Sequence, residues 1–374
     1  GANATWSSIE AAPTASGVAN GSIGVGTAVA VQADGKFAAV TGTNSFFGDA
    51  AEYTGDAVVY HTMCYDTAND KVIVSDRGYN SNLTLVRVGT PSADGKTYTF
   101  GTGANPNGSA ASGSSGGFGM VYDSANNKVI VTFLDEGGRI DSAVGTVSGT
   151  SITWGSIVNV ESTTGMYGGQ CAYDVSTGKV IVVYRQNGTT YSLRVGTVSG
   201  TSISWGSAQN STTASTTTKQ AIIAENGHVT FSGGTKLVVG SYSGNTITFG
   251  SEQTIPFSNG DTACDYLRMA FDPNTGTYMI GGARNGTGNL IEVFGATRSG
   301  TTLTFGSGLV ISTDTSTNYS CCYAGAADKF FWNWGEGNPG TAGYTTVVQV
   351  AGTTSSKTES HKFLLGNNEG TMNS

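Results

Sequence analysis

Short runs of alternating apolar and polar residues recur along the whole chain, and glycine, asparagine or aspartate separates them. The segment KVIVVYR at 179–185 is a clear example, because its neighbours GGQCAYD and YSLRVGT alternate while its own centre, VIVV, is continuously apolar. Alternation predicts a strand with one buried face, and a continuous apolar run predicts a strand buried on both faces. The pattern therefore predicts an all-β protein built of short strands.

One strand pair occurs twice in almost the same letters. The stretch VGTVSGTSITWGS at 144–156 returns as VGTVSGTSISWGS at 195–207, and looser copies begin at Val86, Val238 and Val293. Each copy ends on an aromatic residue, and these residues lie about 50 positions apart, the length of a four-stranded propeller blade. The closing aromatics are Phe100, Trp154, Trp205, Phe249 and Phe305. We expect the two tryptophans to pack between blades.

A second marker is a tight turn between two apolar runs. The turns are ADGK at Ala33, DTANDK at Asp66, DSANNK at Asp123, DVSTGK at Asp174, ENGH at Glu225, DPNTGT at Asp272 and AADK at Ala326. Asn, Asp and Gly tolerate the positive φ that such hairpins require. Seven turns predict a seven-bladed β-propeller of four-stranded antiparallel blades.

The first residues predict how this ring closes. The segment ATWSSIEAAPTAS from Ala4 aligns with SITWGSIVNVEST from Ser151, and nothing before it forms the rest of a blade. We expect it to be the outer strand of the last blade, because ring closure removes exposed sheet edges. The predicted organisation is one propeller domain over 1–360, with 1–15 as the closing strand. Residues 361–374 are then a tail or the start of a further, truncated module.

Composition narrows the class of function. The chain has 374 residues, of which 12% are charged and 10% aromatic, and its formal net charge is −8. An acidic chain without a basic stripe does not suit nucleic-acid binding. The sequence has no run of about 18 apolar residues, so it does not predict membrane insertion. The five cysteines lack CxxC spacing, and the three histidines fall at unrelated repeat positions. We therefore expect no metal site, no cofactor and no disulfide framework.

Candidate ligand-binding residues gather on one predicted face. The loops that follow the second and fourth strand of each blade are longer and more varied than the hairpins at the other face, and variable loops on a rigid scaffold commonly bind ligands. Three arginines directly follow second strands in alternate units, and guanidinium groups suit carboxylate or phosphate. Aromatics at the same face could stack on sugar rings. The predicted set is Arg77, Arg185, Arg284, Tyr167, Tyr266, Tyr319, Trp334 and Glu336.

Other interpretations of these residues remain open. Arginine at a strand end is commonly solvated or paired with a neighbour, and aromatics at loop bases commonly pack. The carboxylates Asp76, Asp135, Glu136 and Glu336 lie in the same segments, where a flanking pair would suit glycoside hydrolysis. No histidine relay is visible. We predict no catalytic residues.

The repeats VGTVSGTSITWGS and VVGSYSGNTITFGS, with turns such as DVSTGKVIVVY, resemble the repeat propellers of tail-fibre and other surface structural proteins of marine bacteriophages and marine bacteria. That resemblance covers nearly the whole chain and implies a scaffold that leads into a further module near HKFLLGNNEGT at His361. A second resemblance is to sialidase propellers, whose S-x-D-x-G-x-T-W box is partly matched by SGTSITW at Ser148, without its Asp. The three arginines resemble the sialidase arginine trio that grips a carboxylate.

These observations predict a non-catalytic protein located outside the cell or on a virion surface, with a structural or attachment role. The expected partners are a surface glycan or host receptor and other virion or surface subunits. The first alternative is a sialidase-like glycoside hydrolase, and the second is a purely architectural subunit that assembles with its own copies.

Overall fold

The computed structural model describes residues 3–5, 16–18, 29–31, 37–39, 58–78, 83–92, 97–107, 119–186, 190–214, 221–233, 236–258, 264–284, 290–312, 316–325, 328–337, 340–351 and 354–364. The chain divides into two compact units, residues 1–50 with 95–97 and residues 51–94 with 98–374. Every regular element in these ranges is a β-strand. They contain no helix with the length and apolar character needed to cross a membrane.

The second unit is a series of sheets that share one strand order. The sheets are numbered in chain order, and the third shows the pattern. It contains four antiparallel strands that pair in sequence order: β14 (Tyr167–Asp174), β15 (Lys179–Arg185), β16 (Thr190–Ser199) and β17 (Ser202–Trp205). A fifth strand, β18 (Gln209–Ala214), pairs with β16 beside β17. The outer edge of β16 is therefore shared by two short strands. The sequence pattern predicted only one strand at that edge.

The other sheets repeat this order with small variations. The first sheet contains β5 (Val58–Asp66), β6 (Lys71–Gly78), β7 (Thr84–Pro91) and β8 (Tyr98–Phe100). The second contains β9 (Gly119–Asp123), β10 (Lys128–Leu134), β11 (Ile140–Ser148), β12 (Ser151–Trp154) and β13 (Val158–Glu161). The fourth contains β19 (Ile222–Glu225), β20 (His228–Gly233), β21 (Lys236–Ser243), β22 (Thr246–Phe249) and β23 (Gln253–Thr254).

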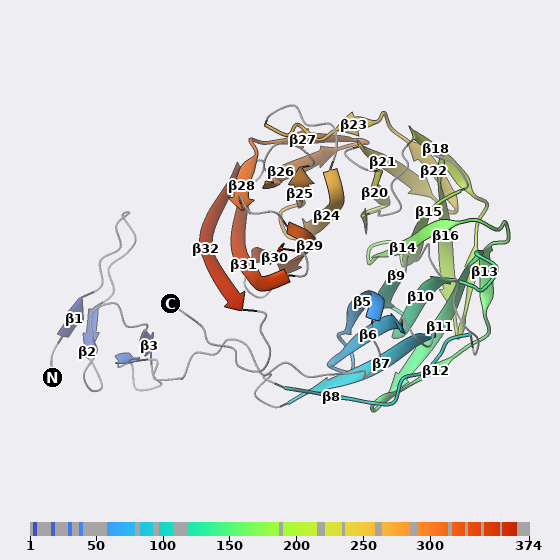
Figure 1. The fold of residues 1–374 in the computed structure, drawn as a ribbon, viewed down its shortest axis with the longest axis horizontal. Coiled ribbons are helices and arrows are strands. Elements are labelled where there is room, and N and C mark those ends of the chain that lie inside the picture. Colours follow the sequence, from blue (N-terminus) through green and yellow to red (C-terminus); the bar gives the residue numbers. More distant parts are fainter. Residues whose placement is uncertain are drawn as a thin grey trace. The chain divides into compact units, whose positions relative to one another are not determined.

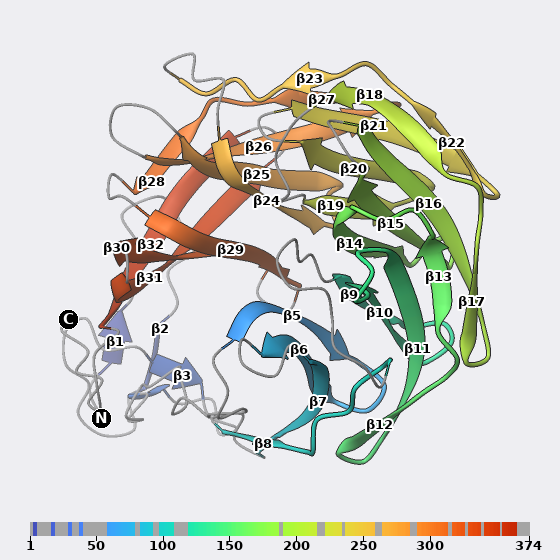
Figure 2. The same ribbon diagram turned by 45° about the vertical axis from the view of Figure 1, so that its right-hand side comes forward.

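The fifth sheet contains β24 (Cys264–Asp272), β25 (Thr277–Arg284), β26 (Ile291–Ser299), β27 (Thr302–Phe305) and β28 (Leu309–Ser312). The sixth contains β29 (Ser316–Ala324), β30 (Lys329–Gly337), β31 (Gly340–Ala351) and β32 (Thr354–Leu364). The first strand of each sheet lies against the first strand of the next, from β5 and β9 to β24 and β29. Figures 1 and 2 show these inner strands around a common centre, with the outer strands at the rim. This arrangement is a β-propeller.

The prediction of seven blades is wrong. The described residues form six sheets of four or five strands, and the turn at Ala33 leads only to a hairpin in which β3 (Val29–Val31) pairs with β4 (Phe37–Ala39). The predicted ring closure is wrong as well. The N-terminal β1 (Asn3–Thr5) pairs with β2 (Ser16–Val18), and β32 already fills the outer position beside β31. A turn motif specifies a hairpin, whereas a blade also needs third and fourth strands.

Five of the six apolar clusters among the described residues lie between two successive sheets, which explains the apolar run VIVV in β15. Val180 and Val182 pack against the second sheet, whereas Ile181 and Val183 pack against the fourth, and all four are fully buried. Successive side chains of a strand point to opposite faces. A second strand held between two neighbours therefore needs apolar residues at every position.

The closing tryptophans pack between blades, as predicted. Trp205 packs into the cluster between the second and third sheets, and its indole Nε1 donates to Ser142 Oγ at 2.9 Å. Gly196 lies opposite Trp205 in the register, and a Cβ there would come within 2.7 Å of the indole ring. The glycine in VGT is therefore required by the close approach of this ring.

Candidate functional site

The strand directions give each sheet two ends with different connections. The hairpins from first to second strand and from third to fourth strand lie at one end, which we call the turn face. The longer connections lie at the other end, which we call the loop face. Candidate residues occur at both ends, so each end is described in turn.

At the turn face, a buried aspartate ends the first strand of four sheets: Asp66, Asp123, Asp174 and Asp272. Each carboxylate accepts hydrogen bonds from the hairpin that follows it. For example, Asp66 Oδ1 accepts from the backbone N–H groups of Ala68 and Asn69, both at 3.0 Å. Aspartate is favoured here because its short side chain can cap a turn.

A tyrosine of the following sheet also donates to this aspartate. Tyr242 Oη donates to Asp174, which in addition accepts from the backbone N–H of Gly227 at 2.7 Å. Burial alone would raise the pKa of Asp174, but hydrogen bonds from Tyr242 and Ser176 outweigh it and lower that pKa. Burial, together with the nearby Asp123 carboxylate, raises the pKa of Tyr173 to about 12. Asp174 therefore joins two adjacent sheets and has a structural role.

Glu225 takes the place of this aspartate in the fourth sheet. It accepts from Tyr278 Oη at 2.5 Å and from Arg298 Nη2 at 3.1 Å, both in the fifth sheet. Its side chain is 8% exposed. This group is a second example of a buried carboxylate that ties two neighbouring sheets.

At the loop face, the structure brings together two of the predicted site residues. Arg185 ends β15 opposite Tyr167, the first residue of β14, and its guanidinium carbon lies 4.3 Å from the centroid of the Tyr167 ring. Arg185 is 7% exposed, so this cation–π pair is mostly buried. The register shifts between Gly168 and Gln170, directly after Tyr167, and such bulges are common beside binding sites.

Arg77 occupies the same register position in the first sheet. In the third sheet, Arg185 lies five residues after Val180, the residue that pairs with Gly196. In the first sheet, Arg77 lies five residues after Val72, the residue that pairs with Gly89. Arg77 is 4% exposed. Both arginines are thus buried at the loop-face end of a seam between sheets.

Arg284 departs from this register. Gly89 and Gly196 each pair with a closing aromatic, but in the fifth sheet Ala296 pairs with Phe305. Tyr278 pairs with Ala296, and Arg284 lies six residues beyond it. A step of one residue moves a side chain to the other face of a strand. The three arginines are therefore not equivalent in register.

The remaining predicted residues lie in the last two sheets. Trp334 is 6% exposed and packs with Phe330 and Trp332 in the cluster between the fifth and sixth sheets. The backbones of Tyr266, Tyr319 and Glu336 belong to β24, β29 and β30, and their side chains lie outside the described residues.

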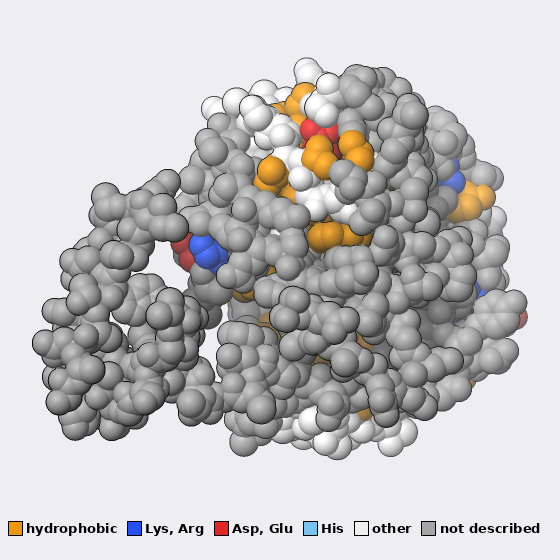
Figure 3. Space-filling model, turned by 60° about the vertical axis from the view of Figure 1, so that its left-hand side comes forward, with side chains coloured by type: hydrophobic (Ala, Val, Ile, Leu, Met, Phe, Trp, Pro, Cys, Tyr) orange, Lys and Arg blue, Asp and Glu red, His pale blue; other side chains and the backbone are white. Residues whose placement is uncertain are grey.

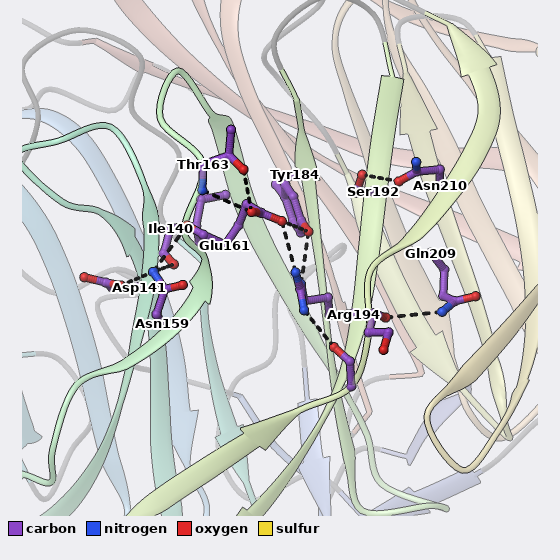
Figure 4. A network of polar contacts seen from close by, with 12 residues as sticks. Ile140, Asp141, Asn159, Glu161, Thr163, Tyr184, Ser192, Arg194, Gln209 and Asn210 are labelled. Carbon is purple, nitrogen blue, oxygen red and sulfur yellow. Dashed lines mark hydrogen bonds and ion pairs between the residues drawn. The ribbon is translucent and has the colours of Figure 1, made fainter.

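Between the second and third sheets, a buried network holds the loop face together (Figure 4). Glu161, at the end of β13, accepts from Tyr184 Oη and from Arg194 Nη2, each at 3.0 Å. It also accepts from Thr163 Oγ1 at 2.9 Å, within its own loop. Burial alone would raise the pKa of Glu161, but hydrogen bonds from Thr163, Arg194 and Tyr184 lower it to about 2. The Glu161 carboxylate therefore anchors the loop before Tyr167.

Sequence reasoning did not identify the hollow that lies on this face. It is a shallow depression of about 480 Å³. Its lining comes from the loop after β8, the segment between β10 and β11, the start of β11, and the segment between β12 and β13: Asn107, Asp135, Glu136, Gly137, Arg139, Asp141 and Ile157. The only signal in the sequence was the pair Asp135 and Glu136, considered for hydrolysis.

Asp135 orients the arginine of this depression. Asp135 Oδ1 accepts from the Arg139 backbone N–H at 2.8 Å, and Oδ2 accepts from Arg139 Nε at 2.7 Å and from Nη2. The Arg139 side chain is still 48% exposed. Asp141 Oδ1 accepts from Asn159 Nδ2 at 2.9 Å, and burial raises the pKa of Asp141. The result is an exposed guanidinium held in one orientation beside carboxylate and amide groups.

Two of the carboxylates considered for catalysis are held by arginines. Asp76 is 1% exposed and bonded to Arg87 Nη1 at 2.5 Å, and Asp135 is bonded to Arg139. Among the described residues, no group of three or more His, Cys, Asp or Glu is placed to hold a metal ion. Burial raises the pKa of the Cys171 thiol to about 12, so this cysteine is a packing residue.

Comparisons with known proteins agree with the fold. No family model matches the chain, and no curated protein shows significant sequence similarity to it. A putative 6-phosphogluconolactonase from Bacteroides fragilis is similar in structure, with a TM-score of 0.56 and 6% identity over 79% of this chain and 82% of that one. A triple arginine-to-alanine mutant of AofleA from Arthrobotrys oligospora has a TM-score of 0.53 and 8% identity, over 83% and 90%.

Aleuria aurantia lectin, solved with α-methyl-L-fucoside, has a TM-score of 0.46 and 12% identity, over 80% of this chain and 93% of that one. At 6% and 8% identity, the first two similarities show the fold and nothing finer.

Proposed function

We propose that this propeller is a non-catalytic attachment protein, located outside the cell or on a virion surface, that binds glycans at its loop face. The observation that carries the proposal is the depression beside Arg139. Sugars are bound by planar polar groups that match their hydroxyls and by apolar surface that covers their C–H groups. Arg139, Glu136 and Asn107 supply the polar groups, and Ile157, which is 37% exposed, supplies the apolar surface.

Two further features support the proposal. The Arg139 guanidinium is held by Asp135, so little conformational freedom is lost when a ligand binds. The loop that leads to Tyr167 is anchored by Glu161. A preformed site on a rigid scaffold suits recognition of a small rigid ligand such as a sugar.

The outer surface also suits an exposed location. The fourth strands β12, β17, β22 and β27 share one burial pattern, in which the exposed first and third residues are always Ser or Thr. On the face shown in Figure 3, the apolar side chains of the described residues lie in small separate groups. Such a surface gives little driving force for non-specific association.

A glycan array tests the proposal directly. We expect the purified chain to capture a defined set of glycans and to leave them intact. Arg139→Ala should weaken capture at least about tenfold, because it removes the preoriented guanidinium. The buried Asp135 loses its partner in this variant, so the unfolding midpoint is measured alongside to confirm that the variant is folded at the assay temperature. Lys71→Ala, which removes a cation at the turn-face end of β6, should bind like the unmodified chain.

Three results would count against this function. Turnover of a fluorogenic sialoside or of a phosphogluconolactone would show an enzyme. Self-assembly with no capture of any glycan would show an architectural subunit. Equal capture by the Arg139→Ala variant would remove the depression as the binding site.

A further inference from the structure

The charges around the depression specify which glycans fit it. Its lining contains three carboxylates, of Asp135, Glu136 and Asp141, and one guanidinium, of Arg139. The other lining residues, Asn107, Gly137 and Ile157, are uncharged. The Asp135–Arg139 pair is neutral as a unit, so the carboxylates of Glu136 and Asp141 leave the depression with an excess of negative charge.

The guanidinium of Arg139 is poorly placed to compensate a carboxylate on a ligand. A two-point contact with a carboxylate uses two parallel N–H groups of the guanidinium fork. Nε and Nη2, which form one edge of that fork, are already bonded to Asp135 Oδ2. Arg139 therefore still offers N–H donors to a hydroxyl, but its best carboxylate-binding edge is occupied.

The same groups suit sugars without acidic substituents. A carboxylate accepts hydrogen bonds, and sugar hydroxyls and ammonium groups are donors. Glu136 is exposed and available to such donors, and Asp141 is half-buried beside Asn159. The net charge of −8 over the whole chain acts in the same direction, because it repels anionic ligands at longer range.

We infer that the loop-face depression selects neutral and amino sugars and rejects sugars that carry a carboxylate or sulfate. This inference rests on the proposed glycan-binding function and specifies its ligand class. It also separates this site from the predicted arginine cluster, in which Arg77 and Arg185 were expected to grip an acid. Those two side chains are buried in seams between sheets.

The test compares pairs of oligosaccharides that differ only in one acidic group. Each captured glycan is titrated by calorimetry in its neutral form, with a sialic acid added, and with one N-acetyl group removed to give a free amine. We expect the neutral form to bind at least about tenfold more tightly than the sialylated form, and the amine to bind at least as tightly as the neutral form. Added salt should reduce the difference, because it screens exposed charges.

Removal of the excess charge provides the decisive variant. In the double variant Glu136→Gln, Asp141→Asn, the ratio of affinities for the neutral and the sialylated glycan should fall by roughly two- to fivefold for each charge removed. This is the size of effect expected for exposed ion pairs. The matched control is Asp70→Asn with Asp328→Asn, which removes two carboxylates at the turn face and should leave the preference unchanged.

The outcomes separate the inference from the function on which it rests. Tighter binding of the sialylated forms would overturn the inference and leave glycan binding intact. An unchanged preference in the Glu136→Gln, Asp141→Asn variant would show that these charges do not set it, which also overturns the inference. Failure to capture any class of glycan would overturn the proposed function itself.

Discussion

The turn face and the loop face carry similar acidic side chains in opposite settings. At the turn face, Asp174 is 1% exposed and accepts hydrogen bonds from its own hairpin and from the next sheet. At the loop face, Glu136 and Arg139 are exposed, and Asp141 is half-buried. The turn-face carboxylate is therefore used to hold sheets together, and the depression on the loop face has polar groups left for a ligand. Three predictions probe this difference, from the largest expected effect to the smallest.

The largest effect should come from the turn face. Asp174→Ala leaves the Gly227 N–H and the Tyr242 hydroxyl without their buried acceptor, and we expect a loss of about 3 kcal/mol in the free energy of unfolding. Urea denaturation measures this loss. The loop-face variant Asp141→Asn should stay within about 0.5 kcal/mol of the unmodified chain. Equal losses in the two variants would contradict the distinction between the faces.

A middle-sized effect should come from Glu161, the buried carboxylate of the loop face. Glu161→Gln should lower stability by about 2 kcal/mol at neutral pH, because the ionised partner of Arg194 is lost. The pKa of this carboxyl falls from 4.5 to about 2 on folding, so its stabilisation is complete above pH 4.5 and is lost as the pH falls toward 2.

The difference in stability between the unmodified chain and the Glu161→Gln variant should therefore shrink over that interval. Denaturation midpoints measured at pH 7, 4 and 2.5 check this. A difference that stays constant with pH would show that packing, and not charge, is the source of the effect.

The smallest effect should separate the two near-identical repeats. Trp205 Nε1 donates to Ser142 Oγ, whereas Trp154 Nε1 has no hydrogen-bond partner among the described residues. Phenylalanine already fills the corresponding position at Phe100, Phe249 and Phe305. Trp205→Phe should lose about 1 kcal/mol more in the free energy of unfolding than Trp154→Phe, the value of one hydrogen bond. Thermal unfolding of the two variants provides the comparison, and equal midpoints would contradict it.

Much of the fold could be predicted from local patterns. The run VIVV in β15 predicted a strand buried on both faces, and the turn DVSTGK predicted a hairpin, and both are present. The number of blades could not be predicted this way. The turn at Ala33 has the residues of a hairpin, but among the described residues β3 and β4 pair with each other and with no third strand.

The candidate site was less accessible to sequence reasoning. Arg185 and Tyr167 were chosen separately and do meet, because both lie at the loop-face end of adjacent strands. Arg284 was grouped with Arg185 because it also follows a second strand, but in its sheet Ala296, and not a glycine, pairs with the closing aromatic. The depression brings together Asn107, Asp135 and Ile157 from three separate connections, and no spacing in the sequence marks their proximity.

The sequence by itself determined the strands, the hairpins and the apolar seams, because each depends on residues within one repeat or on the alternation of side chains along one strand. Tertiary structure alone decided how many sheets form, which register each arginine occupies, and which loops meet around Arg139. Those features depend on contacts between sheets far apart in the chain, where a shift of one residue changes the neighbours of a side chain.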